Sequence, residues 1–560
     1  MSFISTLALF FAVALNPWGV VRHLAPRADT PLSLALWGPI LVALNVLIPI
    51  GLHLTGVPIS KLSLAATHLT LAGGLIGLTL FRRVPLIPAG RNSVIHLAFT
   101  LLVFMILTLP FTHIAGIDTY KWQDLATAVQ VEHNIPWLVH PASLLGFTPR
   151  SYPSAQPLLL ATIQILGGTG VDWGFYILSI LAGAMGLLGA YTLGRRLLAA
   201  DTPAFWFALL YVFSPVFMRY NYWATGRGLL MGLLPLFLLS LLSIPRLSAI
   251  AGWLVMIPLL GMAHKAGSVA VILIPLAFAL SPLLAWLRLR AAPLILVILA
   301  YGAGALLGGL NVGGLSLRLC TRLAVLIPLS LAGWIGASLR PPGSPATLPV
   351  WLANPSWRAM LAGGLATMPL VFTDDMYGTL IALPFVAFAG TVGLQWIIAS
   401  LSPARTRVIL ASTAVMTLVP AIMIVAHQAA DSPSEPVYQA AQFIERHDPH
   451  GPFRIEAPGR ARTQIQAYVS GCPRFNVTTT DESRLIVHAP PPLSGNWRHD
   501  IGIWVHYLRG CLELAGSSTD WYGGAERIYH VTIGEDGVVP KNQPLLFKSG
   551  NVAVFGPSPE

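Results

Sequence analysis

The segment VIHLAFTLLVFMILTLPFTHIAGIDTYKWQD, residues 94–124, contains no Asp, Glu, Lys or Arg before Asp118. Its apolar first part, 94–112, has about the 20 residues that a helix needs to cross a bilayer core. Comparable apolar runs recur along the chain, at 2–21, 32–54, 63–81, 174–194, 204–218, 228–245, 249–263, 267–287, 292–310, 323–339, 358–372, 377–400 and 407–426. The sequence therefore predicts an all-α polytopic membrane protein with about 14 transmembrane helices.

The composition of the whole chain supports a membrane location. Of its 560 residues, 55% are hydrophobic and 10% are charged. A soluble globular protein carries about 25% charged residues because its surface must face water. Lysines and arginines occur mostly singly or in pairs between the apolar runs, which is typical of topology signals and not of a surface that follows phosphates. We therefore expect membrane lipids as partners and no nucleic acid.

The charges divide the chain into two parts. Residues 1–430 hold 22 Lys and Arg against 8 Asp and Glu, whereas residues 431–560 hold 11 against 14. A polar linker at 431–436 is followed by an amphipathic helical pattern at 437–447 and by short candidate strands at 453–457, 527–533 and 551–555. We expect extra N-terminal transmembrane helices over 1–91, a membrane body over 92–430 and a soluble α+β domain over 431–560.

Arginines between the apolar runs set the expected orientation. They are Arg82, Arg83, Arg91, Arg195, Arg196, Arg246, Arg288, Arg290, Arg405 and Arg407. All can be cytoplasmic only if the long loop 113–173 and the domain 431–560 lie outside, which indicates a plasma (inner) membrane protein with an extracytoplasmic C-terminal domain. The apolar piece 155–166 is then expected to be an amphipathic helix at the membrane interface, because a further span would invert every later helix.

Several cations fall on the outer side in this orientation. They are Arg219, Arg227, the pair His264-Lys265, Arg318 and Arg322. An outward cation is unfavourable during insertion, so a set of them suggests that they bind an anion. Snorkelling to the headgroups, or pairing with outer carboxylates, would explain each of them singly.

Acidic residues also gather on the outer side. Asp118 follows the fourth run, Asp124, Glu132 and His133 are supporting candidates beyond it, and Asp374-Asp375 ends a later run. Asp118 with Asp374 and Asp375 would suit Mg²⁺ or Mn²⁺, which prefer oxygen ligands. The alternatives are that Asp118 is a cap or a solvated loop residue, and that Asp374-Asp375 caps a helix beginning near Tyr377.

Four motifs in chain order carry a family resemblance. They are the aspartate after a hydrophobic helix, Tyr152-Pro-Ser-Ala-Gln-Pro-Leu-Leu-Leu160, Tyr191-Thr-Leu-Gly-Arg-Arg-Leu197, and Phe213-Ser-Pro215 followed by Arg219-Tyr220. Together they resemble the polytopic GT-C superfamily of glycosyltransferases, in the branch related to YfhO or named "6-pyruvoyl-tetrahydropterin synthase related". The resemblance covers roughly residues 92–427, and the three helices before it are additional.

The resemblance implies a GT-C-like membrane body that transfers a sugar. Asp118 would be the general base or a metal ligand, the donor a polyprenyl-phosphate-linked sugar, and the acceptor a glycan, lipid or protein. A carboxylate can accept the proton of an acceptor hydroxyl, and the donor phosphate would be bound by Arg219, Arg227, His264 and Lys265. A non-catalytic GT-C-like subunit and a lipid or glycan transporter are the alternatives. A cavity lined by Asp118 together with Arg219 or Arg227 would favour the enzyme.

Two of the three cysteines, Cys472 and Cys511, fall in the domain that the topology places outside. Oxidising compartments permit disulfides, so a bridge between them is the economical interpretation. Two separately buried thiols are the alternative, because the sequence does not supply the distance between them.

Overall fold

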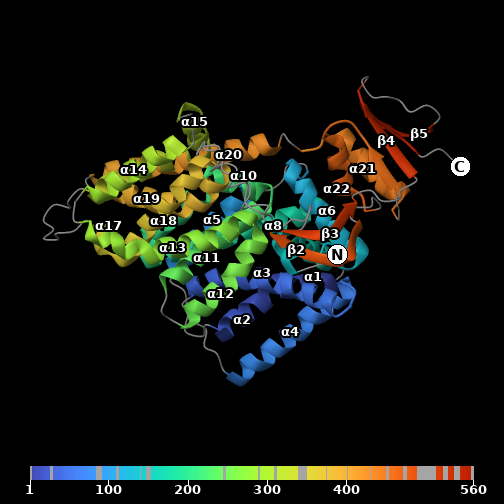
Figure 1. Ribbon diagram of the computed structural model, residues 1–560, viewed down its shortest axis with the longest axis horizontal. Helices are drawn as coiled ribbons and strands as arrows, with labels where there is room; N and C mark the ends of the chain where they lie inside the picture. The colour runs from blue at the N-terminus through green and yellow to red at the C-terminus, as the bar shows by residue number, and fades with distance from the viewer. Residues whose placement is uncertain are drawn as a thin grey trace.

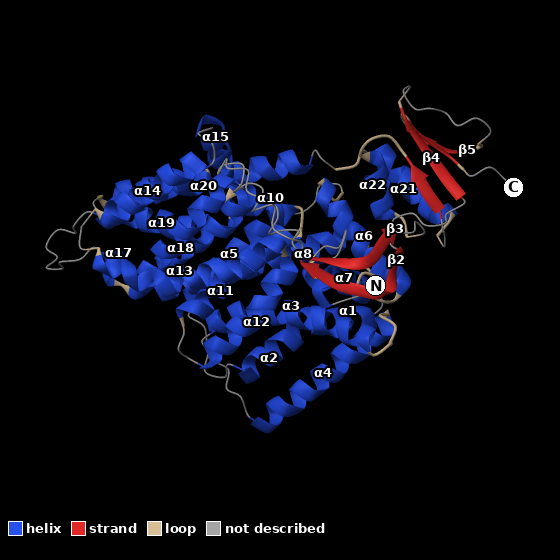
Figure 2. Cartoon of the chain, viewed as in Figure 1, coloured by secondary structure: helices blue, strands red, loops and turns tan. Residues whose placement is uncertain are grey.

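In the computed structural model, helices form a large body and the C-terminal strands lie at one end of it (Figures 1 and 2). The structure describes residues 3–24, 30–82, 91–108, 113–138, 141–146, 153–243, 247–287, 291–307, 312–338, 350–373, 375–399, 401–429, 432–449, 453–470, 476–487, 512–520, 527–534 and 543–556. The protein is mostly helical, with several apolar helices and a small sheet near the C-terminus, as its composition predicts.

The N-terminal helices pack beside the middle of the body. They are α1 (Phe3–Phe10), a π-helical turn (Phe11–Leu15), α2 (Asn16–Leu24), α3 (Thr30–Leu54) and α4 (Lys61–Arg82). Asn16 donates from Nδ2 to the carbonyl oxygen of His68 at 2.8 Å, and Asn45 donates to the carbonyl oxygen of Ala12 at 3.1 Å. Buried hydrogen bonds of this kind join helices where lipid offers no partner.

α8 is the longest of the central helices. In chain order they are α5 (Arg91–Thr108), α6 (Ile117–Glu132), a 3₁₀ turn (Pro141–Leu145), α7 (Ala155–Gly167), α8 (Val171–Leu198), α9 (Asp201–Val212), α10 (Pro215–Tyr222), α11 (Gly226–Leu242), α12 (Leu247–Ala263) and α13 (Lys265–Leu280), which continues into a 3₁₀ turn (Ser281–Trp286). α8 packs against α3, α5, α9 and α11. Its glycines allow this, since a Cβ at Gly194 would lie 2.9 Å from the Cα of Ala204 in α9. Small residues let helices approach closely inside a membrane.

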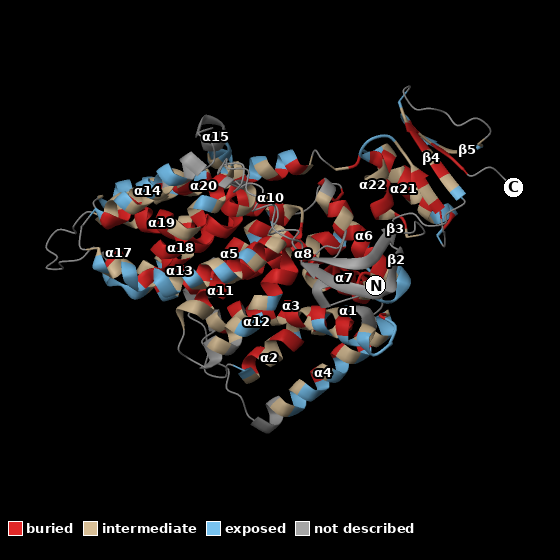
Figure 3. Ribbon diagram, in the orientation of Figure 1, coloured by how far each residue is buried: buried red, intermediate tan, exposed pale blue. Residues whose placement is uncertain are grey.

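The remaining helices form the other end of the body. They are α14 (Ala292–Leu307), α15 (Val312–Leu323), α16 (Leu326–Ser338), α17 (Val350–Ala353), α18 (Pro355–Thr373), α19 (Asp375–Ala399) and α20 (Pro403–Ala429). α16 packs along α19, where Gly333 and Gly393 face the backbone of the partner helix. Figure 3 shows that the inner helices are largely buried, whereas α4 and α14 carry exposed residues. Exposed leucines and isoleucines such as Leu62, Ile76 and Ile298 indicate lipid-facing surfaces.

Seven described helices are long and apolar enough to cross a membrane. They are Thr6–Leu24, Ala35–Leu54, Lys61–Leu78, Val171–Leu198, Lys265–Trp286, Met376–Ala399 and Pro403–Ala429, and the bent pair of α9 and α10 would make an eighth. Each apolar run in the sequence falls on a helix, so the protein is an integral membrane protein. The predicted count of about 14 spans is not confirmed, because several of these helices, such as α9 and α16, are shorter than a bilayer core requires.

The prediction of an amphipathic interfacial helix at 155–166 is wrong. The helix exists as α7, but every residue from Ala155 to Gly167 except the half-buried Ile165 is buried. α7 packs against α1, α3, α6 and α8. An amphipathic helix keeps one polar face in water, whereas α7 is enclosed by other helices on all sides. The segment 113–173 is therefore largely helical and contributes to the core.

The C-terminal residues form a small α+β unit. It contains α21 (Glu435–His447), β1 (Phe453–Glu456), α22 (Ala461–Tyr468), β4 (Arg527–Ile533), β5 (Leu545–Ser549) and β6 (Val552–Phe555). The sheet order is β1-β4-β6-β5, with β1 parallel to β4 and the other pairs antiparallel. A separate antiparallel pair joins β2 (Asn476–Val487) to β3 (Leu512–Asp520). The predicted helix at 437–447 and the three predicted strands are confirmed, while α22, β2, β3 and β5 were not predicted.

Candidate functional site

Local sequence directs α10 towards the start of α6. Ser214 caps α10 by accepting a hydrogen bond from the Phe217 amide at 3.4 Å, and Pro215 takes the first helical position, which suits its fixed φ angle. α10 leaves α9 at an angle of 57°. At the end of α10, the carbonyl oxygen of Trp223 accepts a hydrogen bond from Thr119 Oγ1 of α6 at 3.1 Å. The residues that the two helix ends carry are thereby brought together.

Asp118 lies in the first turn of α6. The prediction of a loop position is corrected: Gly116 precedes the helix with φ +91°, a conformation that glycine adopts without strain, and α6 starts at Ile117. The first turn of a helix favours a carboxylate because its amides carry partial positive charge. Asp118 is therefore held on a regular helix.

Asp118 forms an ion pair with Arg227. Arg227 Nη1 donates to Asp118 Oδ2 at 2.9 Å, and the side chains of Arg227 and Asp118 are 14% and 35% exposed. Arg227 lies in the first turn of α11, and 109 residues separate the two partners in the chain. The structure thus joins two of the predicted site residues by direct contact.

Aromatic rings surround this pair. The guanidinium carbon of Arg227 lies 5.1 Å from the centroid of the Tyr220 ring and 5.6 Å from that of Tyr377. Arg219 lies 5.8 Å from the Tyr220 centroid and 5.1 Å from that of Trp223. Both cations therefore contact one ring, and their guanidinium carbons lie within about 11 Å of each other.

His264 reaches the same cluster from α13. Its ring centroid lies 5.1 Å from that of Tyr377, and its Nδ1 accepts a hydrogen bond from the Ala266 amide at 3.1 Å. His264 is therefore the N-cap of α13, with the half-buried Lys265 as the first helical residue. The start of α13 adds positive partial charge to a region that already holds two arginines.

Other predicted site residues lie elsewhere. Glu132 and His133 are exposed at the far end of α6, about 21 Å along the helix axis from Asp118 at 1.5 Å per residue, so they do not support it. Asp124 is buried on the same helix. Asp375 is the first residue of α19, while Asp374 lies outside the described residues. Within the described part of the chain, no group of three His, Cys, Asp or Glu side chains gathers around a point that would suit a metal.

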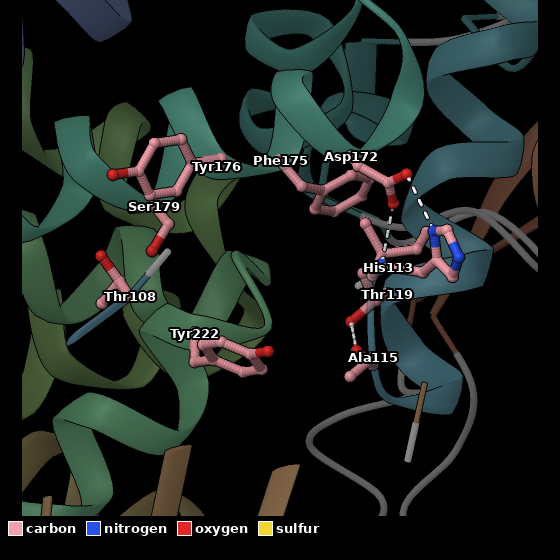
Figure 4. Close-up of a pocket in the computed structure, with 10 residues that line it drawn as sticks. Thr108, His113, Ala115, Thr119, Asp172, Phe175, Tyr176, Ser179 and Tyr222 are labelled. Carbon is pink, nitrogen blue, oxygen red and sulfur yellow. Dashed lines mark hydrogen bonds and ion pairs between the residues drawn. The ribbon is translucent and has the colours of Figure 1, made fainter. Parts of the chain in front are cut away.

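A pocket lies beside the Asp118 pair, between α5, α6, α8 and α10. Figure 4 shows its lining residues: Thr108, His113, Ile114, Ala115, Thr119, Asp172, Phe175, Tyr176, Ser179 and Tyr222. The predicted cavity shared by Asp118 and an arginine is not this pocket, since neither Asp118 nor Arg227 lines it. Thr119, the neighbour of Asp118, and Tyr222, from the arginine-bearing α10, do line it.

Asp172 lies in this pocket wall, in a hydrogen-bond network that was not predicted from the sequence. Asp172 lies in the first turn of α8, and its Oδ1 accepts hydrogen bonds from the Ile114 amide at 2.9 Å and from the Tyr468 hydroxyl at 2.7 Å. His113 Nδ1 lies 3.3 Å from Asp172 Oδ2, and its Nε2 lies 3.6 Å from Glu435 Oε2. The network therefore links the membrane body to the C-terminal unit.

Charge at this network favours a protonated histidine. Burial lowers the pKa of His113, but the carboxylates of Asp172 and Glu435 outweigh burial and raise its pKa above the ordinary value. Burial, with the nearby Asp172 carboxylate, raises the pKa of Tyr468 well above its ordinary value, so this hydroxyl keeps its proton. His113 and Tyr468 are thus hydrogen-bond donors to Asp172.

The fold and the site define a polytopic membrane protein with an aspartate–arginine pair, a second arginine and several tyrosines at converging helix ends. No protein-family model and no characterised protein matches the sequence. Among solved structures, it is similar to ArnT from Cupriavidus metallidurans bound to undecaprenyl phosphate, with 14% identity, a TM-score of 0.46, and 84% of this chain and 98% of that chain covered. The apo state of the same protein gives 13% identity, a TM-score of 0.48, and coverage of 83% and 98%.

Proposed function

We propose that this protein is a membrane glycosyltransferase that moves a sugar from a polyprenyl-phosphate donor to an acceptor hydroxyl, with Asp118 as the general base. The observation that carries the proposal is the ion pair between Asp118 and Arg227, with Arg219 beside the same tyrosine ring. A base for the acceptor and cations for the leaving phosphate are the two requirements of such a transfer.

Asp118 has a free oxygen for the acceptor. Its Oδ2 is engaged by Arg227, whereas its Oδ1 accepts no hydrogen bond from the part of the chain that the structure describes. With 35% of the side chain exposed, a substrate can approach this oxygen. As the acceptor oxygen bonds to the anomeric carbon, its proton passes to Asp118. The bond between that carbon and the phosphate oxygen breaks, and the polyprenyl phosphate leaves with the electron pair.

Arg219 is suited to the donor phosphate. Within the described residues it makes no hydrogen bond to a carboxylate, and its Nε is buried without a partner. Its contacts are the faces of Tyr220 and Trp223, which position a guanidinium without neutralising it. Guanidinium groups form strong charge-assisted hydrogen bonds with phosphate oxygens. His264 and Lys265, at the N-terminus of α13, would add to the positive potential there.

The described residues do not by themselves fit a divalent cation. Asp118 is already paired with Arg227, and no further carboxylate of the described part of the chain joins it. Asp374, the other predicted ligand with Asp375, lies outside these residues. The proposed transfer therefore uses no metal ion, and activity that EDTA removes and Mg²⁺ or Mn²⁺ restores would show that a metal takes part.

The site is proposed to lie on the extracytoplasmic side of the plasma (inner) membrane. Asp172 and the Arg195–Arg196 pair lie near opposite ends of α8, about 35 Å apart at 1.5 Å per residue. This distance exceeds the roughly 30 Å of a bilayer core. If the two arginines are cytoplasmic, as the positive-inside rule favours, Asp172 and the neighbouring Asp118 face the other side.

The test uses the full-length protein in liposomes with a panel of polyprenyl-phosphate sugars, and mass spectrometry to score transfer. We expect Asp118→Asn to lower transfer by about 10²-fold or more, because the amide cannot accept the proton. Asp201→Asn is the matched control, since Asp201 also lies in the first turn of a helix and also pairs with an arginine, Arg195, at 2.9 Å. Equal activity of Asp118→Asn and the parent would reject the proposal. Donor binding by the parent without transfer would identify a non-catalytic scaffold instead.

A further inference from the structure

The C-terminal unit reaches the Asp118 segment through one face of α22. Gln464 and Tyr468 are four residues apart on this helix and therefore lie on the same side of it. The Tyr468 hydroxyl accepts a hydrogen bond from the Ile114 amide at 3.2 Å and donates to Asp172 Oδ1 at 2.7 Å. Gln464 Nε2 donates to the Tyr120 hydroxyl at 3.4 Å.

Both backbone polar groups of Ile114 are connected by hydrogen bonds to these two side chains, one directly and one through Tyr120. The Ile114 amide contacts Tyr468 and Asp172, while its carbonyl oxygen accepts a hydrogen bond from the Tyr120 hydroxyl at 3.1 Å. Tyr120 is in turn the residue that Gln464 bonds. α22 therefore holds Ile114 directly through its amide and indirectly through its carbonyl group.

Ile114 lies just before the turn that leads into α6. Two residues later, Gly116 turns the chain with φ +91° against Trp223, and a Cβ there would lie 2.8 Å from the indole. Asp118 follows within the next two residues, in the first turn of α6. A shift of Ile114 is therefore transmitted over a short and sterically restricted stretch to the proposed base.

We infer that Tyr468 of the C-terminal unit is a positioning residue for Asp118: by fixing Ile114, it sets the orientation in which the carboxylate meets the acceptor. The inference rests on the proposed function. It gives the C-terminal unit a role in the reaction step itself, through a hydrogen bond and not through contact with substrate.

The experiment compares Tyr468→Phe with Tyr438→Phe. Both tyrosine rings pack on His113, with ring centroids 6.1 Å (Tyr468) and 3.6 Å (Tyr438) from that of His113. Within the described residues, only Tyr468 of these two tyrosines forms a hydrogen bond with Ile114. We expect Tyr468→Phe to lower kcat by about tenfold or more, since a small misplacement of a catalytic group is costly. The KM for the donor should stay within about twofold, because the arginines are untouched. Tyr438→Phe should match the parent in both constants.

A second measurement does not depend on activity. Hydrogen–deuterium exchange of the peptide 114–120 should be faster in Tyr468→Phe than in the parent and in Tyr438→Phe. A kcat for Tyr468→Phe equal to that of Tyr438→Phe, or a change in KM alone, would overturn the inference. If the parent protein transfers no sugar, the proposed function and the positioning role both fail. If the parent is active but hydrogen–deuterium exchange of the peptide 114–120 is the same in Tyr468→Phe as in the parent, only the positioning role is overturned.

Discussion

The ion pair between Asp118 and Arg227 should respond unequally to the loss of its two members. Arg227 is only 14% exposed and lies among tyrosine rings, whereas Asp118 is 35% exposed. In Asp118→Ala the buried guanidinium is left without its carboxylate and cannot reach bulk water. In Arg227→Met the remaining carboxylate can be hydrated, and the methionine fills much of the space between the rings.

The expected sizes follow from this asymmetry. Removing one partner of a fully buried pair costs about 3–5 kcal/mol. Because this pair is partly exposed, we expect about 2 kcal/mol for Asp118→Ala and about 1 kcal/mol for Arg227→Met. The Arg195–Asp201 pair has the same 2.9 Å distance, but its side chains are 40% and 58% exposed. Asp201→Ala should therefore cost less than about 1 kcal/mol.

The assay is thermal unfolding of the purified variants in one detergent, followed by intrinsic tryptophan fluorescence. The order of decreasing unfolding midpoints should be parent, then Asp201→Ala, then Arg227→Met and finally Asp118→Ala. An Arg227→Met midpoint below that of Asp118→Ala would refute the reasoning, because it would mean that the carboxylate is the less hydrated partner. Equal midpoints for all three variants would show that the pair is not buried in detergent.

Three further predictions concern pH, topology and cysteines. The pKa of His113 is higher in the folded protein than in the unfolded chain, so protonated His113 stabilises the fold fully below the ordinary histidine pKa, and this stabilisation is lost as the pH rises through the raised pKa. The midpoint of thermal unfolding should therefore fall from pH 6 to pH 8, and His113→Gln should make that fall smaller. A cysteine that replaces the exposed Arg446 should react with a membrane-impermeant thiol reagent added to intact cells. A cysteine that replaces the exposed Arg196 should react only after the cells are permeabilised, and the reverse pattern would mean that the topology is inverted. Because we expect a bridge between Cys472 and Cys511, which lie outside the described residues, the denatured, unreduced protein should show one free thiol, and a count of three would refute the bridge.

Hydrophobic periodicity was sufficient to place most of the helices, but not α6, α15, α17 or α22. Every apolar run became a helix, and the amphipathic pattern at 437–447 became α21. Runs alone could not predict the number of spans, because an apolar helix enclosed by protein has the same composition as one enclosed by lipid. α7 is the clearest case, since its residues from Ala155 to Leu160 are fully buried by neighbouring helices and not by a membrane surface.

Two of the predicted site residues are in direct contact in the structure. Asp118 was chosen because it follows a hydrophobic helix in the GT-C-like order of motifs, and Arg227 because an outward cation is unfavourable in a membrane; the two lie 2.9 Å apart. Glu132 and His133 were chosen for nearness in sequence, and α6 then carries them away from Asp118. Tyr468 lies 296 residues after its partner Asp172 and has no local signature, so only the folded chain reveals it.

The buried helix α7 explains why the segment between Asp118 and Asp172 is so long. Gln164 of α7 donates to Gln123 Oε1 of α6 at 2.9 Å, and it also packs against Gly174 of α8, where a Cβ would lie 2.7 Å from its side chain. One buried glutamine therefore contacts both helices whose first turns carry the two aspartates. A short loop would leave α6 and α8 free to shift relative to each other, whereas a helix packed between them fixes the distance from Asp118 to the network around Asp172. The middle part of the long segment therefore packs against both of the helices that carry the two carboxylates.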